Sequence, residues 1–176
     1  MSDCLIVIPA RFKSVRLPGK PLRKIGGETM IKRVYNKCVA TGLDTVVATD
    51  DFRISKECAD NDMEFIMTSE HCLTGTDRVA DAVSITTKQY AGYINVQGDE
   101  PFVNPDDILK IAEEMTPRAF DRKTDEVFCG MCRITEKEQY YSPHVPKIVF
   151  NQDKPNCSGL LRYISRAPIP AVKEGY

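Results

Sequence analysis

The chain has 176 residues, 42% of them hydrophobic, which is enough for one buried core and therefore for one domain or a domain with a small appendage. Its 24 lysines and arginines balance 25 aspartates and glutamates, so the net charge of −1 excludes the broad positive field with which proteins hold nucleic acid nonspecifically. Because there is no secretory signal pattern and no apolar run near the roughly 20 residues that span a bilayer, we expect a soluble, cytoplasmic protein with no membrane partner.

Short apolar runs alternate with amphipathic stretches along the first two thirds of the chain. The runs are short and mostly rich in β-branched residues, which is typical of strands, at 4–9, 44–49, 63–68 and 92–97. The amphipathic stretches show helical spacing at 29–41, 51–61, 76–90 and 105–115, the last opened by Asn104 as N-cap. This alternation predicts a three-layer α/β/α, Rossmann-like domain with a mostly parallel sheet.

The character of the sequence changes after Met115. A polar stretch follows, and then come strand-like runs at 127–134, 146–150 and 160–165. The last two runs predict a β-hairpin around the turn-rich segment between them. We expect residues 1–134 to form the α/β core and 135–176 to form a hairpin extension of the same domain.

The seven cysteines are odd in number and scattered through apolar patterns, which indicates reduced, buried thiols in a cytosolic protein. Cys129 and Cys132 form a Cys-x-x-Cys pair, but no second pair or flanking histidine completes the four ligands of a zinc site. Core packing is therefore favoured for this pair over metal binding or redox work.

Three polar clusters follow predicted strands. They are Arg11, Lys13, Arg16 and Lys20 with Gly19 after the first strand; Thr49, Asp50 and Asp51 after the second; and Gln97, Gly98, Asp99 and Glu100 after the fourth. Ligands of open parallel sheets bind at the carboxyl ends of strands. We therefore expect the strands ending at Pro9, Thr49 and Gln97 to lie side by side or nearly so, with Lys20 and Asp99 on the same face of the sheet.

These clusters suit the transfer of a nucleotidyl group. A triphosphate carries about four negative charges, and catalysis at phosphorus depends mainly on positioning and on charge neutralisation by cations. Mg²⁺ prefers carboxylate oxygen, which the third cluster supplies. The first loop has neither the P-loop pattern nor G-x-G-x-x-G, and a charged loop alone is more often solvated surface, so the prediction depends on the order and the shared edge of the clusters.

Several longer motifs resemble the 3-deoxy-manno-octulosonate cytidylyltransferase (CMP-Kdo synthetase) family in order and spacing. They are "IPARFKSVRLPGKPLRKIGGETMI", "VVATDD", "TGTDRVADAV", "INVQGDEPFV", "VPKIVF" and "YISRAPIP". The resemblance implies a nucleotidyltransferase fold and an enzyme that joins CMP from CTP to the acid sugar Kdo for lipopolysaccharide synthesis. It also implies Mg²⁺ as cofactor, pyrophosphate as the second product, a cytoplasmic location and a homodimer.

The resemblance also implies roles for individual residues. The triphosphate would be held by Arg11 and Lys20, with Ser14 and Arg16 assisting, and the cytosine would be bordered by the backbone of Pro9 and Ala10. The rest of the nucleotide would contact Gly75, Thr76, Arg78 and Gln97. Asp99 would bind the metal, and Arg11, Lys20 and Asp99 together would carry catalysis. The sugar would meet Lys147 and Arg166.

Two departures from the family pattern stand out. Asp77 occupies a position where glutamate is common, and the C-terminal third of a family member, with a second metal-binding aspartate, is not in this sequence. Three alternatives stay open: a cytidylyltransferase for 8-amino-Kdo, one for sialic acid, or a non-catalytic protein that binds nucleotide or dimerises.

Overall fold

The computed structural model describes residues 3–13, 17–119, 126–152 and 159–169. The chain divides into two compact units, Met1–Phe128 and Cys129–Tyr176. This division lies near the boundary that we expect after residue 134; the separate roles of the two parts stay a prediction. Within the described ranges, no helix combines the length and the apolar character that crossing a bilayer requires.

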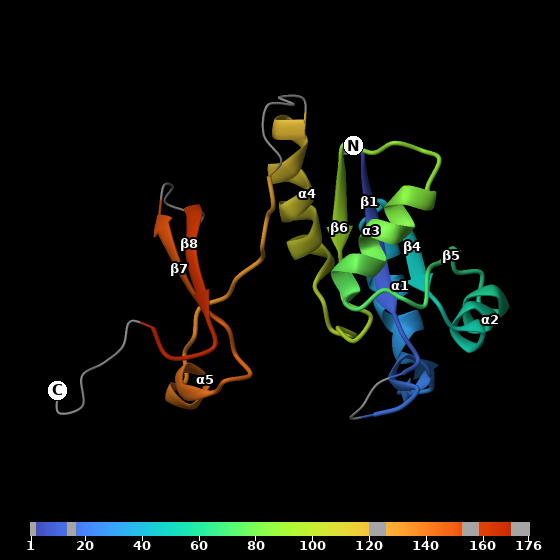
Figure 1. The fold of residues 1–176 in the computed structure, drawn as a ribbon, viewed down its shortest axis with the longest axis horizontal. Coiled ribbons are helices and arrows are strands. Elements are labelled where there is room, and N and C mark those ends of the chain that lie inside the picture. The colour runs from blue at the N-terminus through green and yellow to red at the C-terminus, as the bar shows by residue number, and fades with distance from the viewer. Residues whose placement is uncertain (1–2, 14–16, 120–125, 153–158, 170–176) are drawn as a thin grey trace. The chain divides into compact units, whose positions relative to one another are not determined.

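The first unit is built on a four-stranded parallel sheet (Figure 1). Its strands are β1 (Cys4–Ala10), β4 (Asp44–Thr49), β5 (Phe65–Met67) and β6 (Gly92–Asn95), in the order β5-β4-β1-β6. Since β1 pairs with both β4 and β6, the predicted neighbourhood of the three strands that precede the polar clusters is confirmed.

Helices cover both faces of this sheet. Figure 1 shows α3 (Gly75–Ile85) in front of the strands and α1 (Met30–Val39) behind them. The core on the α1 face also includes residues of α2 (Phe52–Asp60) and α4 (Pro105–Ala119). The predicted three-layer arrangement is therefore confirmed.

Side-chain alternation along β1 explains the two cores. Successive side chains of a strand point to opposite faces of the sheet, and because both faces are covered here, every residue of β1 is buried. The α1 face receives Cys4, Ile6, Ile8 and Ala10. The α3 face receives Leu5 and Val7 together with Ala82 of α3. A strand buried on both faces reads as a continuous apolar run, which is how β1 appears in the sequence.

Side chains cap the helices near the strand ends. Asp51 accepts a hydrogen bond from the backbone N–H of Arg53 at the start of α2. The Oδ1 atom of Asn104 accepts one from the N–H of Asp106 at the start of α4, as expected of an N-cap. The expected end of α4 at Met115 is wrong, since the helix continues to its end given above. Polarity alone does not end a helix: among the four residues that extend it, arginine and alanine have high helix propensity, although Pro117 is unfavourable in a helix interior.

Three short elements between β1 and α1 were not predicted. They are the 3-10 helix η1 (Lys20–Leu22) and the antiparallel strands β2 (Lys24–Ile25) and β3 (Glu28–Thr29). Both glycines of the connecting turn, Gly26 and Gly27, have positive φ angles of 58° and 91°. Such a pair of residues is what a tight two-residue hairpin turn requires.

The second unit contains α5 (Lys137–Tyr141) and the strands β7 (Lys147–Gln152) and β8 (Gly159–Ser165). The two strands pair antiparallel, which confirms the predicted hairpin. The strand expected at 127–134 is wrong, because residues 126–135 form neither helix nor strand. An apolar run becomes a strand only where a neighbour pairs with its backbone, and the described ladder of this unit joins only β7 to β8.

Cysteines follow the expectation in part. Cys4, Cys38 and Cys58 are buried, as expected. Burial raises the pKa of both Cys38 and Cys58 to about 12, so these thiols are inert near neutral pH. Cys129 and Cys132 are exposed, so core packing is wrong for this pair. Cys157 lies outside the described residues.

Candidate active site

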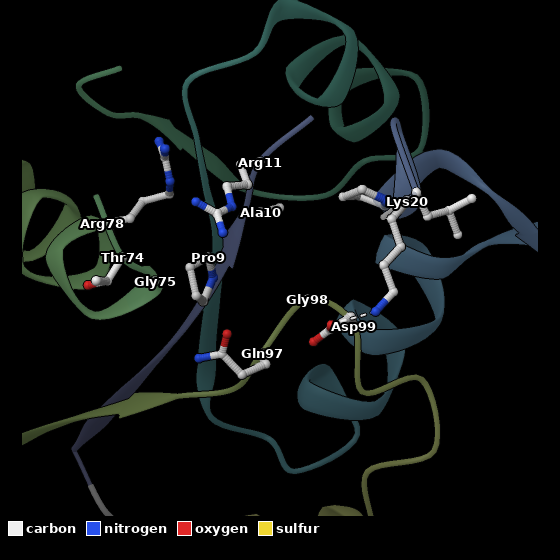
Figure 2. A pocket seen from close by; sticks show the side chains of 12 residues that line it. Pro9, Ala10, Arg11, Lys20, Thr74, Gly75, Arg78, Gln97, Gly98 and Asp99 are labelled. Carbon is white, nitrogen blue, oxygen red and sulfur yellow. Dashed lines mark hydrogen bonds and ion pairs between the residues drawn. The ribbon is translucent and has the colours of Figure 1, made fainter. Parts of the chain in front are cut away.

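A pocket of about 440 Å³ lies at the carboxyl ends of β1 and β6, beside the start of α3 (Figure 2). It is lined by Pro9, Ala10, Arg11, Leu17, Lys20, Pro21, Thr74, Gly75, Arg78, Gln97, Gly98 and Asp99. Most of the residues predicted to contact nucleotide are in this lining. Thr76 is exposed on the first turn of α3 and is not in it, and Ser14 and Arg16 lie outside the described residues.

One cation and one carboxylate meet in the pocket. Nζ of Lys20 lies 2.6 Å from Oδ2 of Asp99, and both side chains are partly exposed. Figure 2 shows the lysine extending from the segment between β1 and β2, here called the opening loop, toward the aspartate that follows β6. The prediction that these two groups share one face is confirmed. A partly exposed ion pair contributes little to stability, so the pair matters for the chemistry that it brings together rather than for the fold.

Gly98 lets Asp99 reach this position. A Cβ atom built on Gly98 would lie 2.9 Å from the carbonyl oxygen of Pro9, which is backbone and cannot turn away. The chain that leaves β6 therefore passes over the end of β1 at a distance that only glycine allows. The sequence motif contains this glycine between Gln97 and Asp99, but its packing against β1 was not predicted.

The start of α3 forms another wall of the pocket. Thr74 caps the helix by accepting from the N–H of Asp77, whose carboxylate in turn accepts from the N–H of Thr74. Gly75 follows, and a Cβ atom there would lie 3.2 Å from Oε1 of Gln97. The first N–H groups of a helix carry partial positive charge, so this wall suits an anion. The T-x-x-D spacing was the signal that could have identified Thr74.

Arg11 reaches toward the same wall. Its Nη1 donates to the carbonyl oxygen of Leu73 at 3.4 Å, and the side chain borders the pocket (Figure 2). Two cations, Arg11 and Lys20, thus line the pocket from the loop that follows β1. This is the local positive feature expected of a phosphate site in a chain with almost no net charge.

Arg78 is the buried member of the lining. Only 3% of its side chain is exposed, and its guanidinium donates to Oγ1 of Thr68 at 2.6 Å and lies 3.2 Å from Oδ2 of Asp50. A guanidinium has five N–H groups in a fixed plane. These partners engage both terminal nitrogens of Arg78 and so hold the group in one orientation. A contact of Arg78 with nucleotide stays a prediction.

The second polar cluster does not enter the pocket as expected. Asp50 turns to Arg78, and Asp51 caps α2 and pairs with Arg53. Neither carboxylate is part of the pocket lining, and neither is Glu100. A strand end brings a residue near the crevice, but buried and capping partners compete for its side chain, and here those partners prevail.

The two residues predicted to meet the sugar belong to the second unit. Lys147 is 2% exposed, and its ammonium donates to the carbonyl oxygens of Ser142, Val145 and Arg166. The Arg166 side chain donates to the carbonyl oxygen of Pro143 at 3.1 Å. Both cations therefore hold the base of the hairpin. A sugar contact of either residue stays a prediction.

Within the described ranges, no three Asp, Glu, His or Cys side chains converge as a ready-made metal site. Mg²⁺ is usually held by only one or two carboxylates, with phosphate oxygens and water completing its shell. Asp99 in a pocket that suits phosphate fits this arrangement.

Comparison with known proteins agrees with this geometry. Residues 5–175 match the family model described as cytidylyltransferase. The 3-deoxy-manno-octulosonate cytidylyltransferase of Marinobacter nauticus is 37% identical over 172 residues, which make up 96% of this chain and 62% of the relative. The corresponding protein of Coxiella burnetii (strain RSA 493 / Nine Mile phase I) is 38% identical over 168 residues, 94% of this chain and 64% of the relative.

A solved structure is similar over nearly the whole chain. CMP:2-keto-3-deoxy-manno-octonic acid synthetase, solved in complex with CTP, superposes with a TM-score of 0.79 and 31% identity over 98% of this chain and 68% of its own. The chain spans less than two thirds of the curated relatives named above, 62% and 64% of their length. On the match of the family model over residues 5–175, this chain belongs to the cytidylyltransferase family.

Proposed function

We propose that the protein containing this chain transfers CMP from CTP to Kdo, giving CMP-Kdo and pyrophosphate. The observation that carries the proposal is the Lys20–Asp99 pair, 2.6 Å apart in a pocket at the ends of β1 and β6. A cation for phosphate and a carboxylate for a hard metal ion are the two groups that nucleotidyl transfer needs in one place. The relatives that carry the same activity in their names support it.

The opening loop is assigned to the triphosphate. Lys20 and Arg11 would donate to its non-bridging oxygens, and the first turn of α3 would add backbone N–H groups and partial positive charge. The attacking atom is the oxygen of the anomeric hydroxyl of Kdo. As its bond to the α-phosphorus forms, the bond from phosphorus to the leaving oxygen breaks, pyrophosphate departs with the electron pair of that bond, and the hydroxyl proton passes to solvent water. Fixed cations lower the barrier because they neutralise charge without reorganising.

Asp99 is assigned to Mg²⁺. When bound, the ion would neutralise phosphate charge and orient the attacking hydroxyl. Asp99 would provide the protein oxygen, held at the end of β6 by the close passage of Gly98 over β1. Gln97, whose amide donates to Oδ1 of Asn95, would face the base or the ribose.

The identity of the sugar rests on the relatives' names, and two residues of the second unit support an acid sugar as the class. Arg166 would meet the carboxylate of Kdo, and Lys147 would support it by holding the Arg166 carbonyl oxygen at 2.9 Å. The acid group is common to Kdo, 8-amino-Kdo and sialic acid, so this contact selects an acid sugar rather than one member of the class. We also propose a cytoplasmic homodimer acting in lipopolysaccharide synthesis, as the resemblance implies.

The test is pyrophosphate release from CTP in the presence of Mg²⁺ and one acid sugar at a time. Kdo should support release, and 8-amino-Kdo and sialic acid should support it less. Lys20→Ala should reduce release, whereas Lys56→Ala, which removes an exposed cation from α2 away from the pocket, should not. No release with any acid sugar, by the protein that contains this chain when it is folded and binds CTP, would contradict the proposed transfer.

A further inference from the structure

Phe12 lies where the opening loop meets α2. Cζ of Arg53, in the first turn of that helix, is 3.3 Å from the centroid of the Phe12 ring. A guanidinium over an aromatic face is attracted by the negative charge of the π system. Phe12 is the only aromatic residue between Arg11 and Lys20, so this is the one place in the loop where such a contact can form.

Arg53 is itself held in place. Its Nε and Nη2 atoms lie 2.9 Å and 2.6 Å from the two carboxylate oxygens of Asp51, a bidentate pairing with fixed geometry. Asp51 also caps α2 through the N–H of Arg53. The hydrogen bonds from Arg53 hold the pKa of the Asp51 carboxyl below its ordinary value, so the pair stays charged at neutral pH. The guanidinium is therefore fixed relative to the start of the helix.

Phe12 connects this pair to Lys20. The N–H of Gly19 donates to the carbonyl oxygen of Phe12 at 3.0 Å, and a Cβ atom on Gly19 would lie 3.0 Å from two ring carbons. Gly19 has a φ angle of 68° and directly precedes Lys20, whose ammonium reaches Asp99. Each step from Asp51 to Lys20 is thus a direct contact or a peptide bond.

We propose that Asp51, Arg53 and Phe12 form an anchor that positions Lys20 for the triphosphate. None of the three side chains lines the pocket, so they are positioning residues that act through the loop. Arg53 is largely exposed, and an exposed ion pair alone adds little to stability. We therefore expect the stacking of Arg53 on Phe12 to act mainly on the position of the loop. The inference rests on the proposed function for the identity of the anion.

The test compares two exposed cations of α2. Arg53→Gln removes the charge above Phe12, and the control Lys56→Gln removes the partner of Asp60, an exposed pair on the same helix. The first readout is hydrogen exchange of the Gly19 amide, which needs no nucleotide. The second is turnover with CTP, separated into KM and kcat.

Arg53→Gln should speed Gly19 exchange and raise the KM for CTP by about two- to fivefold, the range of an exposed cation–π contact, while kcat changes less. Arg53→Lys keeps a cation over the ring and should recover part of the loss. Asp51→Asn keeps an oxygen that can cap α2 and should change both readouts in the same direction as Arg53→Gln. Lys56→Gln should change neither.

Gly19 exchange at the parent rate in Arg53→Gln, or an equal change in Lys56→Gln, would overturn the anchor. Faster exchange of the Gly19 amide with an unchanged KM for CTP would show that Arg53 stabilises the loop but does not position Lys20, and this would overturn the proposal as well. A parent chain that neither binds nor uses CTP would end the proposed function instead, and the exchange comparison would still decide whether the anchor exists.

Discussion

The two ends of the parallel sheet both carry a lysine–aspartate pair, but the surroundings of the pairs differ. At the carboxyl end, Lys20 and Asp99 line a pocket together with Arg11 and the start of α3. At the amino end, Lys88 lies 2.7 Å from Asp44, and the hydroxyl of Tyr90 donates to the same Asp44 oxygen at 2.8 Å. A similar ion pair thus lines a pocket at one end of the sheet and joins two segments of the chain at the other.

The hollow beside the amino-end pair is also different. It measures about 280 Å³, and its lining, within the described part of the chain, includes Asp44 and Glu64 but no lysine or arginine. This described lining offers a triphosphate no lysine or arginine to pair with. The two ion pairs are therefore distinguished by the loops around them: the basic loop that follows β1 contributes to the carboxyl-end pocket, whereas the described lining of the amino-end hollow contains no basic residue.

The largest expected effect is a loss of activity when the aspartate of the carboxyl-end pair, but not that of the amino-end pair, is replaced by asparagine. Asp99→Asn keeps the shape of the side chain but removes its charge, so activity should fall at least about a hundredfold, as when one charge-stabilising group leaves a catalytic site. Asp44→Asn should leave activity unchanged. Turnover assays with and without Mg²⁺ measure both, and melting curves should show little change for Asp99→Asn. Full Mg²⁺-dependent activity of Asp99→Asn would refute its assignment to the metal.

The next largest expected effect is on stability, when a buried cation and an exposed cation are each replaced by leucine. Arg78 is buried and pairs with Asp50, so Arg78→Leu should lower the free energy of unfolding by about 2–3 kcal/mol because it strands a carboxylate and a buried hydroxyl. Lys88→Leu removes an exposed cation from the amino end and should leave the urea midpoint close to that of the parent. Equal midpoints for the two variants would show that the buried Arg78–Asp50 pair contributes no more to stability than the exposed Lys88–Asp44 pair.

Two glycines at opposite ends of β6 give a further contrast. Gly98→Ala should cost about 1–3 kcal/mol, since a methyl group there meets a backbone oxygen. It should also reduce turnover by displacing Asp99. Gly92→Ala meets mainly the flexible end of Met115 and should cost less. Urea unfolding and CTP turnover of both variants check the order, and a larger activity loss in Gly92→Ala would reverse the comparison.

The smallest effect is the pH dependence of the amino-end pair. Hydrogen bonds from Lys88 and then Tyr90 lower the pKa of Asp44. A carboxyl whose pKa is lowered in the folded state stabilises the protein at pH values above its unfolded pKa of about 3.9. This stabilisation is lost as the pH falls through the folded pKa. The stability difference between the parent and Asp44→Asn should therefore be small at pH 7 and shrink below about pH 4. A difference that grows on acidification would show the opposite sign.

The sequence predicted the sheet because its central strands are continuous apolar runs that only burial on two faces explains, as in β1. It also predicted that Lys20 and Asp99 lie on the same face of the sheet, since both follow strands that end at the same edge, and the direct ion pair between them is a finding of the structure. It could not predict where side chains turn when several partners compete. Asp51 turns to Arg53, two residues further on, and Lys147 is enclosed by backbone carbonyl oxygens of its own unit, because both choices depend on the geometry of the surrounding turns.

The central claim is that the pocket at the carboxyl ends of β1 and β6 binds the triphosphate of CTP. The most direct test is the dissociation constant of CTP for the parent, Lys20→Ala and Lys88→Ala, measured by calorimetry at one salt concentration. Loss of one charged hydrogen bond should weaken binding about tenfold or more in Lys20→Ala. Lys88→Ala should bind like the parent. Equal affinity of all three chains, or a loss confined to Lys88→Ala, would contradict the account.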